Sequence, residues 1–174
     1  MTFEGVRPSD VIVTLTRGLE TIVSGIDAPV VRAHRWHAHF NQNGEPYARN
    51  RRAGLLQRFI VRPPLAWLVA DHINGNPLDN RRFNLRVCSP SENARNAIGK
   101  GRSGLKGVSW NGKRWRARIM APNGVERFLG AYNCPSEAAR AYDAAALEYH
   151  GPFAWLNFPV EIDKEGELPL DVPF

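Results

Sequence analysis

The sequence predicts an α+β protein built from two small modules. Its first half holds short β-branched segments divided by turn residues, and its second half holds three strand patterns followed by one alanine-rich helix pattern. The stretch AIGKGRSGLKG, residues 97–107, separates the halves, because glycine and charge disfavour a packed element. We therefore expect a first domain at 1–98, a basic Gly-rich linker at 99–103, a second domain at 104–159 and an acidic tail at 160–174.

The composition indicates a polyanionic partner. The 174 residues include 23 Lys and Arg against 17 Asp and Glu, which gives a formal net charge of +6 and a sequence pI of about 9.8. Nucleic acid is the commonest partner of so basic a chain, and a charge that only keeps the protein soluble is the alternative. Residues 93–125 contain basic side chains and no acidic one, whereas the segment after residue 160 is acidic.

The cysteines and the hydropathy pattern predict a cytoplasmic protein without membrane contact. Cys88 and Cys134 lie far apart and form no CxxC pair, so they provide no four-thiolate zinc site, and reduced thiols are the simpler interpretation. The N-terminus has no apolar signal core, and no run approaches the roughly 18 apolar residues of a membrane span.

The first half begins with strand and hairpin patterns. DVIVTLTRG at 10–18 and ETIVSGI at 20–26 are rich in β-branched residues and predict two strands. RWHAHFNQNGEPYARNRR at 35–52 predicts a hairpin with QNGEP at its tip, because Asn-Gly supplies the positive φ angles of a tight turn. GLLQRFIV at 54–61 fits a short helix or a strand, and Pro63-Pro64 ends it.

The stretch at 68–96 predicts a strand, a long loop, a second strand and a helix. LVADH forms the first strand, the turn residues of NGNPLDN form the loop, and NLRVC forms the second strand. Ser89 is then a good N-cap, Pro90 suits the first helical position, and Glu92 completes a capping box with Ser89.

Three side chains of this stretch suggest phosphodiester chemistry. Asp71 at the end of the first strand and Asn93 in the first helical turn offer oxygen ligands to one Mg²⁺ or Mn²⁺ ion. His72 is the natural general base, because an unperturbed imidazole accepts a proton near neutral pH. A metal and a base beside arginines can hydrolyse a phosphodiester. An Asp-His pair in an ordinary turn is the plain alternative.

The second half predicts a three-stranded antiparallel sheet with one packed helix. KGVSW, RWRARIM and ERFLGAY are the strands, Asn111-Gly112 and Asn123-Gly124 mark the turns, and a helix runs from Pro135 to about His150. In RWRARIM, Trp115, Ala117 and Ile119 alternate with two arginines, which predicts one face toward the helix and a basic face toward solvent or the DNA major groove.

The sequence DHINGNPLDNRRFNLRVCSPSENARN resembles the HNH endonucleases of the phage and intron homing type. The resemblance implies a ββα-metal fold around one divalent ion. It makes Asp71 a metal ligand, His72 the base that activates water, and Asn84 the asparagine that braces the loop and orients the histidine. Asn93 takes the place of the second metal ligand, with Asn96 as the alternative.

The segment upstream of this motif also resembles the family. The HNH endonucleases of this group often carry His-Arg-Leu-Ile before the motif, and here Gln57-Arg58-Phe59-Ile60 stands in that place. Glutamine therefore replaces the usual histidine.

Residues 104–159 resemble the AP2/ERF DNA-binding domain through GVSW, RWRARI, FLGAY, EAARAYDAAA and LNFP. In that family the sheet reads DNA through arginines and tryptophans. Together with the phosphate-binding arginines of the HNH motif, the resemblance predicts these DNA contacts: Arg81, Arg82, Arg95, Lys100, Arg102, Lys106, Trp110, Lys113, Arg114, Arg116 and Arg118.

These observations predict a metal-dependent endonuclease that acts on double-stranded DNA. With one active site per chain, a monomer or weak homodimer would nick one strand and leave 5′-phosphate and 3′-hydroxyl ends. The family implies the cytoplasm of a bacterial or phage-infected host cell. A DNA-binding regulator without catalysis is the rival class. An RNA-binding or structural protein is less favoured, because the sheet lacks the exposed aromatic pair of base-stacking RNA modules.

Overall fold

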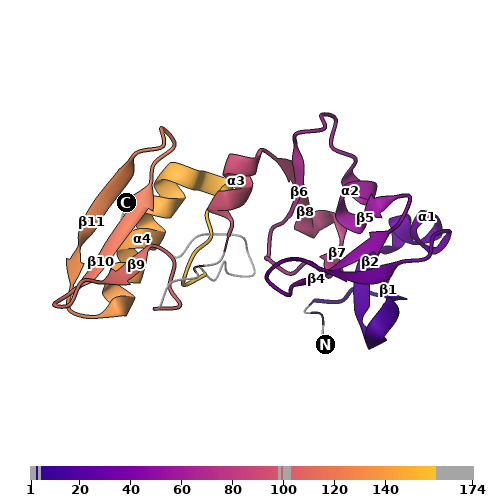
Figure 1. Cartoon of the computed structure of the whole chain (residues 1–174), viewed down its shortest axis with the longest axis horizontal. Helices are drawn as coiled ribbons and strands as arrows, with labels where there is room; N and C mark the ends of the chain where they lie inside the picture. Colours follow the sequence, from indigo (N-terminus) through magenta and orange to yellow (C-terminus); the bar gives the residue numbers. More distant parts are fainter. Residues whose placement is uncertain (1–2, 4, 98, 100–102, 160–174) are drawn as a thin grey trace. The chain divides into compact units, whose positions relative to one another are not determined.

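The chain folds into two compact units, Met1–Asn93 and Ala94–Phe174. The computed structural model describes residues 3, 5–97, 99 and 103–159, and Figure 1 traces their elements along the chain. The division falls inside a helix, ahead of the predicted domain limit at 98. Part of the predicted linker and the predicted acidic tail lie outside the described residues. The mixed α+β class with small antiparallel sheets is confirmed.

The first sheet of the N-terminal unit joins the start of the chain to the motif loop. The two predicted strands are present but shorter, and β1 (Asp10–Thr14) pairs antiparallel with β2 (Glu20–Ser24). The two residues of β7 (Asp79–Asn80) pair parallel with β2, where the sequence predicted only a loop. The backbone amide of Ile22 also donates to the carbonyl of Leu78 at 3.0 Å. These bonds fix the motif loop to a distant strand, which local turn chemistry could not indicate.

The second sheet contains the predicted hairpin. Strands β3 (His37–Phe40) and β4 (Pro46–Asn50) pair antiparallel, and β5 (Gly54–Leu55) adds a short edge. In the turn, the side-chain oxygen of Asn41 accepts from the amides of Asn43 and Glu45, both at 2.9 Å. The ambiguous segment 54–61 becomes β5 followed by helix α2 (Leu56–Val61). Helix α1 (Ala28–Arg32) precedes the hairpin.

The motif itself forms the predicted strand, loop, strand and helix. Strand β6 (Val69–His72) pairs antiparallel with β8 (Leu85–Cys88), and helix α3 (Pro90–Arg95) follows. The capping box is confirmed, because a Glu92 carboxylate oxygen accepts from the Ser89 amide at 2.7 Å while the Ser89 hydroxyl accepts from the Glu92 amide at 3.2 Å. Single 3₁₀ turns complete the connections of this unit at Thr16–Gly18, Gly25–Asp27 and Arg82–Asn84.

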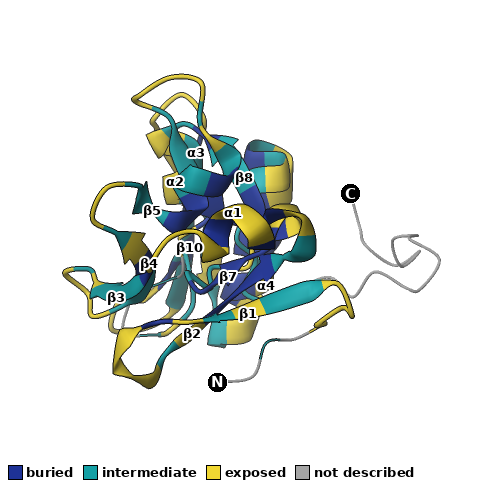
Figure 2. Cartoon of the chain, turned by 90° about the vertical axis from the view of Figure 1, so that its right-hand side faces the viewer, coloured by how far each residue is buried: buried dark blue, intermediate teal, exposed yellow. Residues whose placement is uncertain are grey.

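One apolar core supports the N-terminal unit. Figure 2 shows that its connecting loops, including the turn between β3 and β4, are mainly exposed. Each large apolar side chain buried in such a core stabilises the fold by roughly 1.5–3 kcal/mol. The core contains residues from strands, helices and loops throughout the unit, namely Leu15, Val23, Ala28, Val31, Trp36, Ala48, Leu56, Ile60, Leu78 and Leu85.

The C-terminal unit is the predicted sheet with one helix. Strands β9 (Val108–Trp110), β10 (Trp115–Met120) and β11 (Glu126–Tyr132) form an antiparallel sheet in the order β11-β10-β9. Helix α4 (Pro135–His150) packs against β10 and β11, and a 3₁₀ turn at Gly151–Phe153 follows it. No helix among the described residues is long and apolar enough to cross a bilayer.

Small side chains let α4 approach the sheet closely. Ala117 and Ile119 of β10 are buried against the helix, which confirms the predicted alternation of this strand. Gly107 precedes β9 with φ +73°, and a Cβ added there would lie 1.9 Å from a ring carbon of Tyr142. Only glycine fits this position, because a side chain would meet both strain and overlap.

Candidate functional site

The predicted ligand and the predicted base end the same strand of the N-terminal unit. Asp71 pairs with Arg86, and His72 pairs with Leu85, across the β6–β8 hairpin. Both polar side chains are buried, with 7% of Asp71 and 6% of His72 exposed. Successive residues of a strand face opposite sides, so each of the two side chains meets its own set of neighbours.

Asp71 is held by an arginine from the neighbouring strand. The guanidinium of Arg86 lies against one carboxylate oxygen, Oδ2, with Nε and Nη2 both at 2.8 Å. A charge-assisted contact of this kind holds the carboxylate in one orientation. A carboxylate has further lone pairs, so the arginine contact is compatible with a role as a metal ligand. The sequence pattern did not predict this contact of Arg86 with Asp71.

His72 is held by a chain of buried hydrogen bonds. Its Nε2 lies 3.2 Å from the Asn80 side-chain oxygen, and the Asn80 amide nitrogen donates to the Thr21 hydroxyl at 2.8 Å. The Thr21 hydroxyl in turn donates to the carbonyl of Leu78 at 2.7 Å. This chain orients the Asn80 amide, so its side-chain oxygen accepts a hydrogen bond from Nε2–H of His72. In the neutral ring, Nδ1 is then the nitrogen that can accept a proton.

Burial keeps the imidazole of His72 in its neutral form. Burial lowers the pKa of His72, while the bond to Asn80 and the charges of Asp71 and Asp79 partly oppose this shift. A neutral imidazole at neutral pH is the form that a general base requires. Tyr47 of β4 adds a ring whose centroid is 6.3 Å from that of His72. No sequence pattern predicted the contacts of Tyr47 and Asn80 with the histidine.

Asn84 braces the loop between the strands. Its oxygen accepts from the backbone amide of Asn74 at 2.9 Å, and its nitrogen donates to the backbone carbonyl of Asp79 at 2.7 Å. These bonds agree with the predicted bracing role, while the contact with the His72 ring comes from Asn80. The family resemblance predicts that Asn84 also orients the histidine, but the contact with the ring is made by Asn80.

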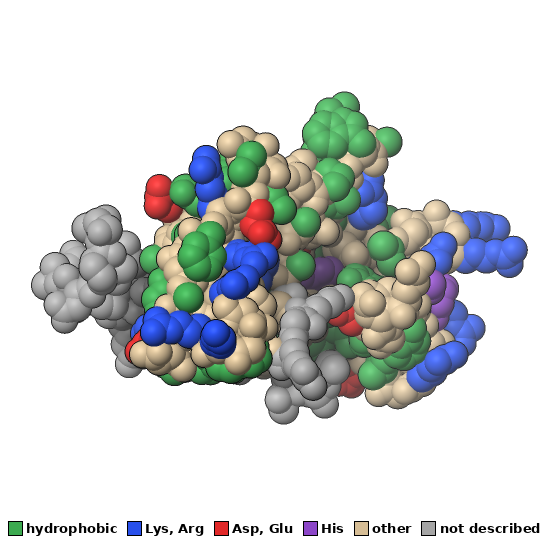
Figure 3. Space-filling view, turned by 60° about the vertical axis from the view of Figure 1, so that its left-hand side comes forward, with side chains coloured by type: hydrophobic (Ala, Val, Ile, Leu, Met, Phe, Trp, Pro, Cys, Tyr) green, Lys and Arg blue, Asp and Glu red, His purple; other side chains and the backbone are tan. Residues whose placement is uncertain are grey.

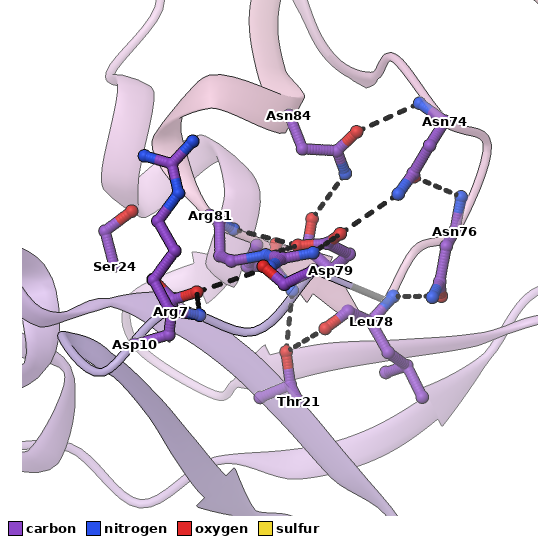
Figure 4. A network of polar contacts seen from close by, with 12 residues as sticks. Arg7, Asp10, Thr21, Ser24, Asn74, Asn76, Leu78, Asp79, Arg81 and Asn84 are labelled. Carbon is purple, nitrogen blue, oxygen red and sulfur yellow. Dashed lines mark hydrogen bonds and ion pairs between the residues drawn. The ribbon is translucent and has the colours of Figure 1, made fainter. Parts of the chain in front are cut away.

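A second buried network surrounds Asp79, as Figure 4 shows. Arg81 donates from Nε and Nη2 to the two oxygens of Asp79, both at 2.7 Å, and from Nη1 to Asp10 at 3.3 Å. Nη1 also reaches the carbonyl of Gly5 at 2.8 Å, and the Asn74 side chain donates to Asp79 at 3.0 Å. Arg81 is only 3% exposed. These contacts favour a structural role for Arg81 over the predicted contact with DNA.

Arg82 also forms an ion pair with a buried aspartate, but its own side chain remains exposed. Its Nε and Nη2 contact the two oxygens of the buried Asp27 at 2.8 and 2.7 Å, and its backbone amide donates to the Ser24 hydroxyl at 3.0 Å. The Arg82 side chain is 55% exposed. The Arg82 guanidinium is therefore accessible to solvent while it holds its ion pair.

The second predicted metal ligand lies on α3. The Asn93 side chain is exposed and makes no hydrogen bond to the described residues. The alternative, Asn96, is buried and falls in the C-terminal unit. A carboxylate oxygen from Asp71 and an amide oxygen from Asn93 are hard donors that suit Mg²⁺ or Mn²⁺. Among the described residues no group of three or more His, Cys, Asp and Glu side chains could hold a metal ion.

Gln57 occupies the place of the family's usual histidine. It is 4% exposed on α2, and within the described part of the chain its Oε1 atom is buried without a hydrogen-bond partner. A buried acceptor without a donor costs stability. The structure gives no reason for glutamine at this position.

The first predicted DNA contacts of the C-terminal unit are partly enclosed. The ammonium of Lys106 donates to the backbone carbonyl of Arg95, and burial lowers the pKa of Lys106 to about 8. The Lys106 backbone is held by Asn157, which also donates to Asp143 at 2.8 and 3.0 Å. Lys106 therefore connects the segment after α4 with the end of α3 within this unit. The predicted contacts Lys100 and Arg102 lie outside the described residues.

The predicted basic side chains of the sheet and its first turn are exposed or partly exposed to solvent. Lys113 and Arg114 are exposed in the turn between β9 and β10, where the Asn111 side chain accepts from both amides. Arg116 and Arg118 are partly exposed on β10, and Arg118 forms an ion pair with the exposed Glu126 at 3.2 Å.

Trp110 differs from these arginines. It pairs across the sheet with Trp115, and their ring centroids are 5.2 Å apart. Directly opposed residues share a face of a sheet. Trp110 therefore lies on the face of Trp115, opposite the face of Arg116, although it is 52% exposed.

Comparison with known proteins defines the class of this chain. The HNH endonuclease family matches residues 64–95, which span β6, the motif loop, β8 and α3. An ethylene-responsive transcription factor of Arabidopsis thaliana is 46% identical over 57 residues, which are 32% of this chain and 30% of that protein. The resemblance to an HNH endonuclease with a C-terminal AP2/ERF-type domain is confirmed.

Two viral relatives cover more of the chain. Protein 3.8 of Escherichia phage T7 is 42% identical over 88 residues, 48% of this chain and 71% of that protein. A protein of Acanthamoeba polyphaga mimivirus, named an uncharacterized HNH endonuclease, is 26% identical over 147 residues, 81% of this chain and 76% of that protein. The chain belongs to the family of the phage protein. It spans 15% to 31% of the length of three similar Arabidopsis proteins.

Proposed function

We propose that this protein is a metal-dependent DNA endonuclease that nicks duplex DNA as a monomer or weak homodimer. The supporting observation is the buried bond between His72 and Asn80, inside the segment that matches the HNH endonucleases. This bond and the burial of the ring give a neutral imidazole with its basic nitrogen at Nδ1. Such a group is suited to take a proton from water.

In the proposed reaction, His72 accepts a proton at Nδ1 from a water molecule that attacks the phosphorus. A new bond forms between the water oxygen and phosphorus, and the bond from phosphorus to the 3′ oxygen breaks. The departing oxygen takes a proton from solvent, which leaves 3′-hydroxyl and 5′-phosphate ends. Asn80 keeps the imidazole oriented, and Asn84 holds the loop that carries it.

Asp71 and Asn93 would hold one divalent cation, Mg²⁺ or Mn²⁺. When bound, the cation stabilises negative charge on the phosphate and on the departing oxygen. Arg86 keeps the Asp71 carboxylate oriented for this role. The oxygen character of both donors favours these ions over zinc, which prefers nitrogen and sulfur.

The C-terminal unit would grip the same DNA molecule. A three-stranded sheet with exposed basic side chains fits the major groove, where arginines bond guanine edges or phosphates. Arg114, Arg116 and Arg118 are the proposed contacts on this sheet. Phosphate contacts release counterions, so the affinity should fall steeply with salt.

The proposal is tested by incubating supercoiled plasmid with the full chain and Mg²⁺ or Mn²⁺. Wild type should yield nicked circles, and His72→Ala should lose at least about 100-fold in rate while DNA binding stays unchanged. Intact plasmid with wild type under both ions and on a library of target sequences would refute the endonuclease. In that case unchanged DNA binding would favour a regulator, the class that the plant transcription-factor similarity supports.

A further inference from the structure

The N-terminal unit has a basic surface of its own, apart from the residues already proposed to contact DNA. Between residues 28 and 70 the single acid is Glu45. The same interval contains no lysine but many arginines, namely Arg32, Arg35, Arg49, Arg51, Arg52, Arg58 and Arg62. Such an excess in one segment repels itself unless an anion lies near it.

Most of the arginines in this interval are left without an acidic partner. The arginines Arg35, Arg49, Arg51 and Arg52 are exposed, and no ion pair among the described residues includes them. The buried aspartates of the unit pair instead with arginines of the HNH motif. The charge of the hairpin region is therefore available to an external partner. Figure 3 shows basic side chains projecting beside histidine at the right of the molecule.

The register of β3 and β4 gathers polar side chains on one face. His37 lies opposite Arg49, and His39 lies opposite Tyr47. Directly opposed residues share a face, and so do residues two apart in a strand. Ala48 faces the other way and is fully buried in the core. We call the side formed by His37, His39, Tyr47 and Arg49 the hairpin face.

The hairpin face is continuous with the candidate active site. Tyr47 on this face has its ring centroid 6.3 Å from that of His72. Side chains on one face of a strand recur about every 6.8 Å, which is close to the axial advance of two base pairs in a DNA strand, about 3.4 Å each. A phosphate backbone lying along the face would therefore lead toward His72.

We infer that the hairpin face, together with Arg51 and Arg52, is a second DNA-contact surface that holds the phosphate backbone beside the bond to be cut. The inference rests on the proposed endonuclease function and assigns it substrate contacts within the nuclease unit. The partner is duplex DNA recognised by charge, because exposed arginines beside partly exposed histidines contact phosphates and carry little base information.

The test compares two triple variants of the full chain that lose the same charge. The hairpin variant carries Arg49→Gln, Arg51→Gln and Arg52→Gln, and the control carries Arg7→Gln, Arg32→Gln and Arg62→Gln, which are also exposed. Binding to duplex DNA is measured in chelator from low to high salt. The hairpin variant should bind about 10- to 100-fold more weakly at 0.15 M salt, and its log–log salt slope should fall by about 2–3. The control should change the slope by less than about 1.

Hydroxyl-radical footprinting locates the lost contacts. The hairpin variant should lose protection next to the nick and keep the protection given by the C-terminal unit. Replacing the same three arginines with lysine should restore most of the binding, since lysine still contacts phosphate as a point charge. Equal binding and equal footprints for hairpin and control variants, with a wild type that cuts, would overturn the inference. A wild type that binds but never cuts would instead refute the endonuclease.

Discussion

The two units solve the burial of acidic side chains in different ways. In the N-terminal unit, buried Asp10, Asp27, Asp71 and Asp79 each face an arginine. In the C-terminal unit Asp143 is buried instead by accepting from the backbone amides of Asn157 and Phe158 at 2.8 and 2.9 Å. In the N-terminal unit, ion pairs hold the irregular loops of the candidate site in place. In the C-terminal unit, the carboxylate of Asp143 on α4 holds the segment that follows the helix through backbone hydrogen bonds.

The largest expected effect of this difference comes from removing Asp79. Asp79→Ala leaves Arg81 buried without its main partner and removes the acceptor of Asn74. Breaking a buried pair in this way costs about 3–5 kcal/mol. Hydrogen exchange followed by mass spectrometry should show lost protection in β1, β2 and β6, with β10 and α4 unchanged.

The matched control for Asp79 is Glu126→Ala in the other unit. It breaks the exposed pair with Arg118, whose side chains are 40% and 54% exposed, and should cost under about 1 kcal/mol. Equal loss of protection in both units after Asp79→Ala would mean that they do not unfold separately.

The C-terminal unit should instead be most sensitive to its closest packing. Gly107→Ala forces a side chain into Tyr142 at a positive φ angle, and the overlap and strain together cost about 2–4 kcal/mol. Gly112→Ala is the control, because its φ is also positive (+95°) but nothing lies within 4 Å of the added Cβ. Denaturant unfolding should therefore separate the two variants. Equal midpoints would contradict the close contact between Gly107 and α4.

The same contrast explains what the sequence could predict. In the C-terminal unit, strand alternation, Asn-Gly turns and the Pro135 start are local signals, and β9, β10, β11 and α4 follow them closely. The capping box of Ser89 and Glu92 is equally local. These elements depend on neighbours in the chain, so their patterns are visible without a structure.

The polar site depended on contacts between distant residues. Thr21 reaches Asn80 across 59 positions and Asp10 reaches Arg81 across 71, so no local pattern could reveal either bond. The motif therefore indicated Asp71 and His72, but it could not show that Arg81 is enclosed or that Asn80 contacts the histidine. The cytoplasmic location stays a prediction from the sequence.

After the two losses of stability, the next smaller expected effect is on the rate of DNA nicking. Asn80→Ala removes the acceptor of the His72 Nε2 proton, so the ring can turn and take the other tautomer. A misplaced base should slow nicking about 10- to 100-fold at saturating DNA with unchanged binding. Imidazole ¹⁵N shifts should report mixed protonation of Nε2 and Nδ1 in the variant. Asn76→Ala, which removes a different loop contact, is the control and should keep the wild-type tautomer.

The smallest expected effect is a pH dependence that each unit carries through its own buried histidine. The pKa of His150 is lowered by burial first, against the bond from Nε2 to the Met120 carbonyl at 2.8 Å. Among the described residues its Nδ1 is buried without a partner, so a second proton is disfavoured in the folded state. The unfolded chain then binds more protons below its pKa of about 6.5. Stability is therefore complete above that pH and falls as the pH drops below it.

His150→Gln separates this contribution from that of the other unit. Glutamine can still donate to the Met120 carbonyl but does not titrate, so the C-terminal unit should lose its dependence on acid between pH 7 and 5. His72 remains in that variant, and its pKa is also lowered by burial, so the N-terminal unit should still weaken in acid. Hydrogen exchange at several pH values measures each unit by itself. An unchanged acid dependence of α4 in His150→Gln would mean that another group, and not this imidazole, couples the C-terminal fold to pH.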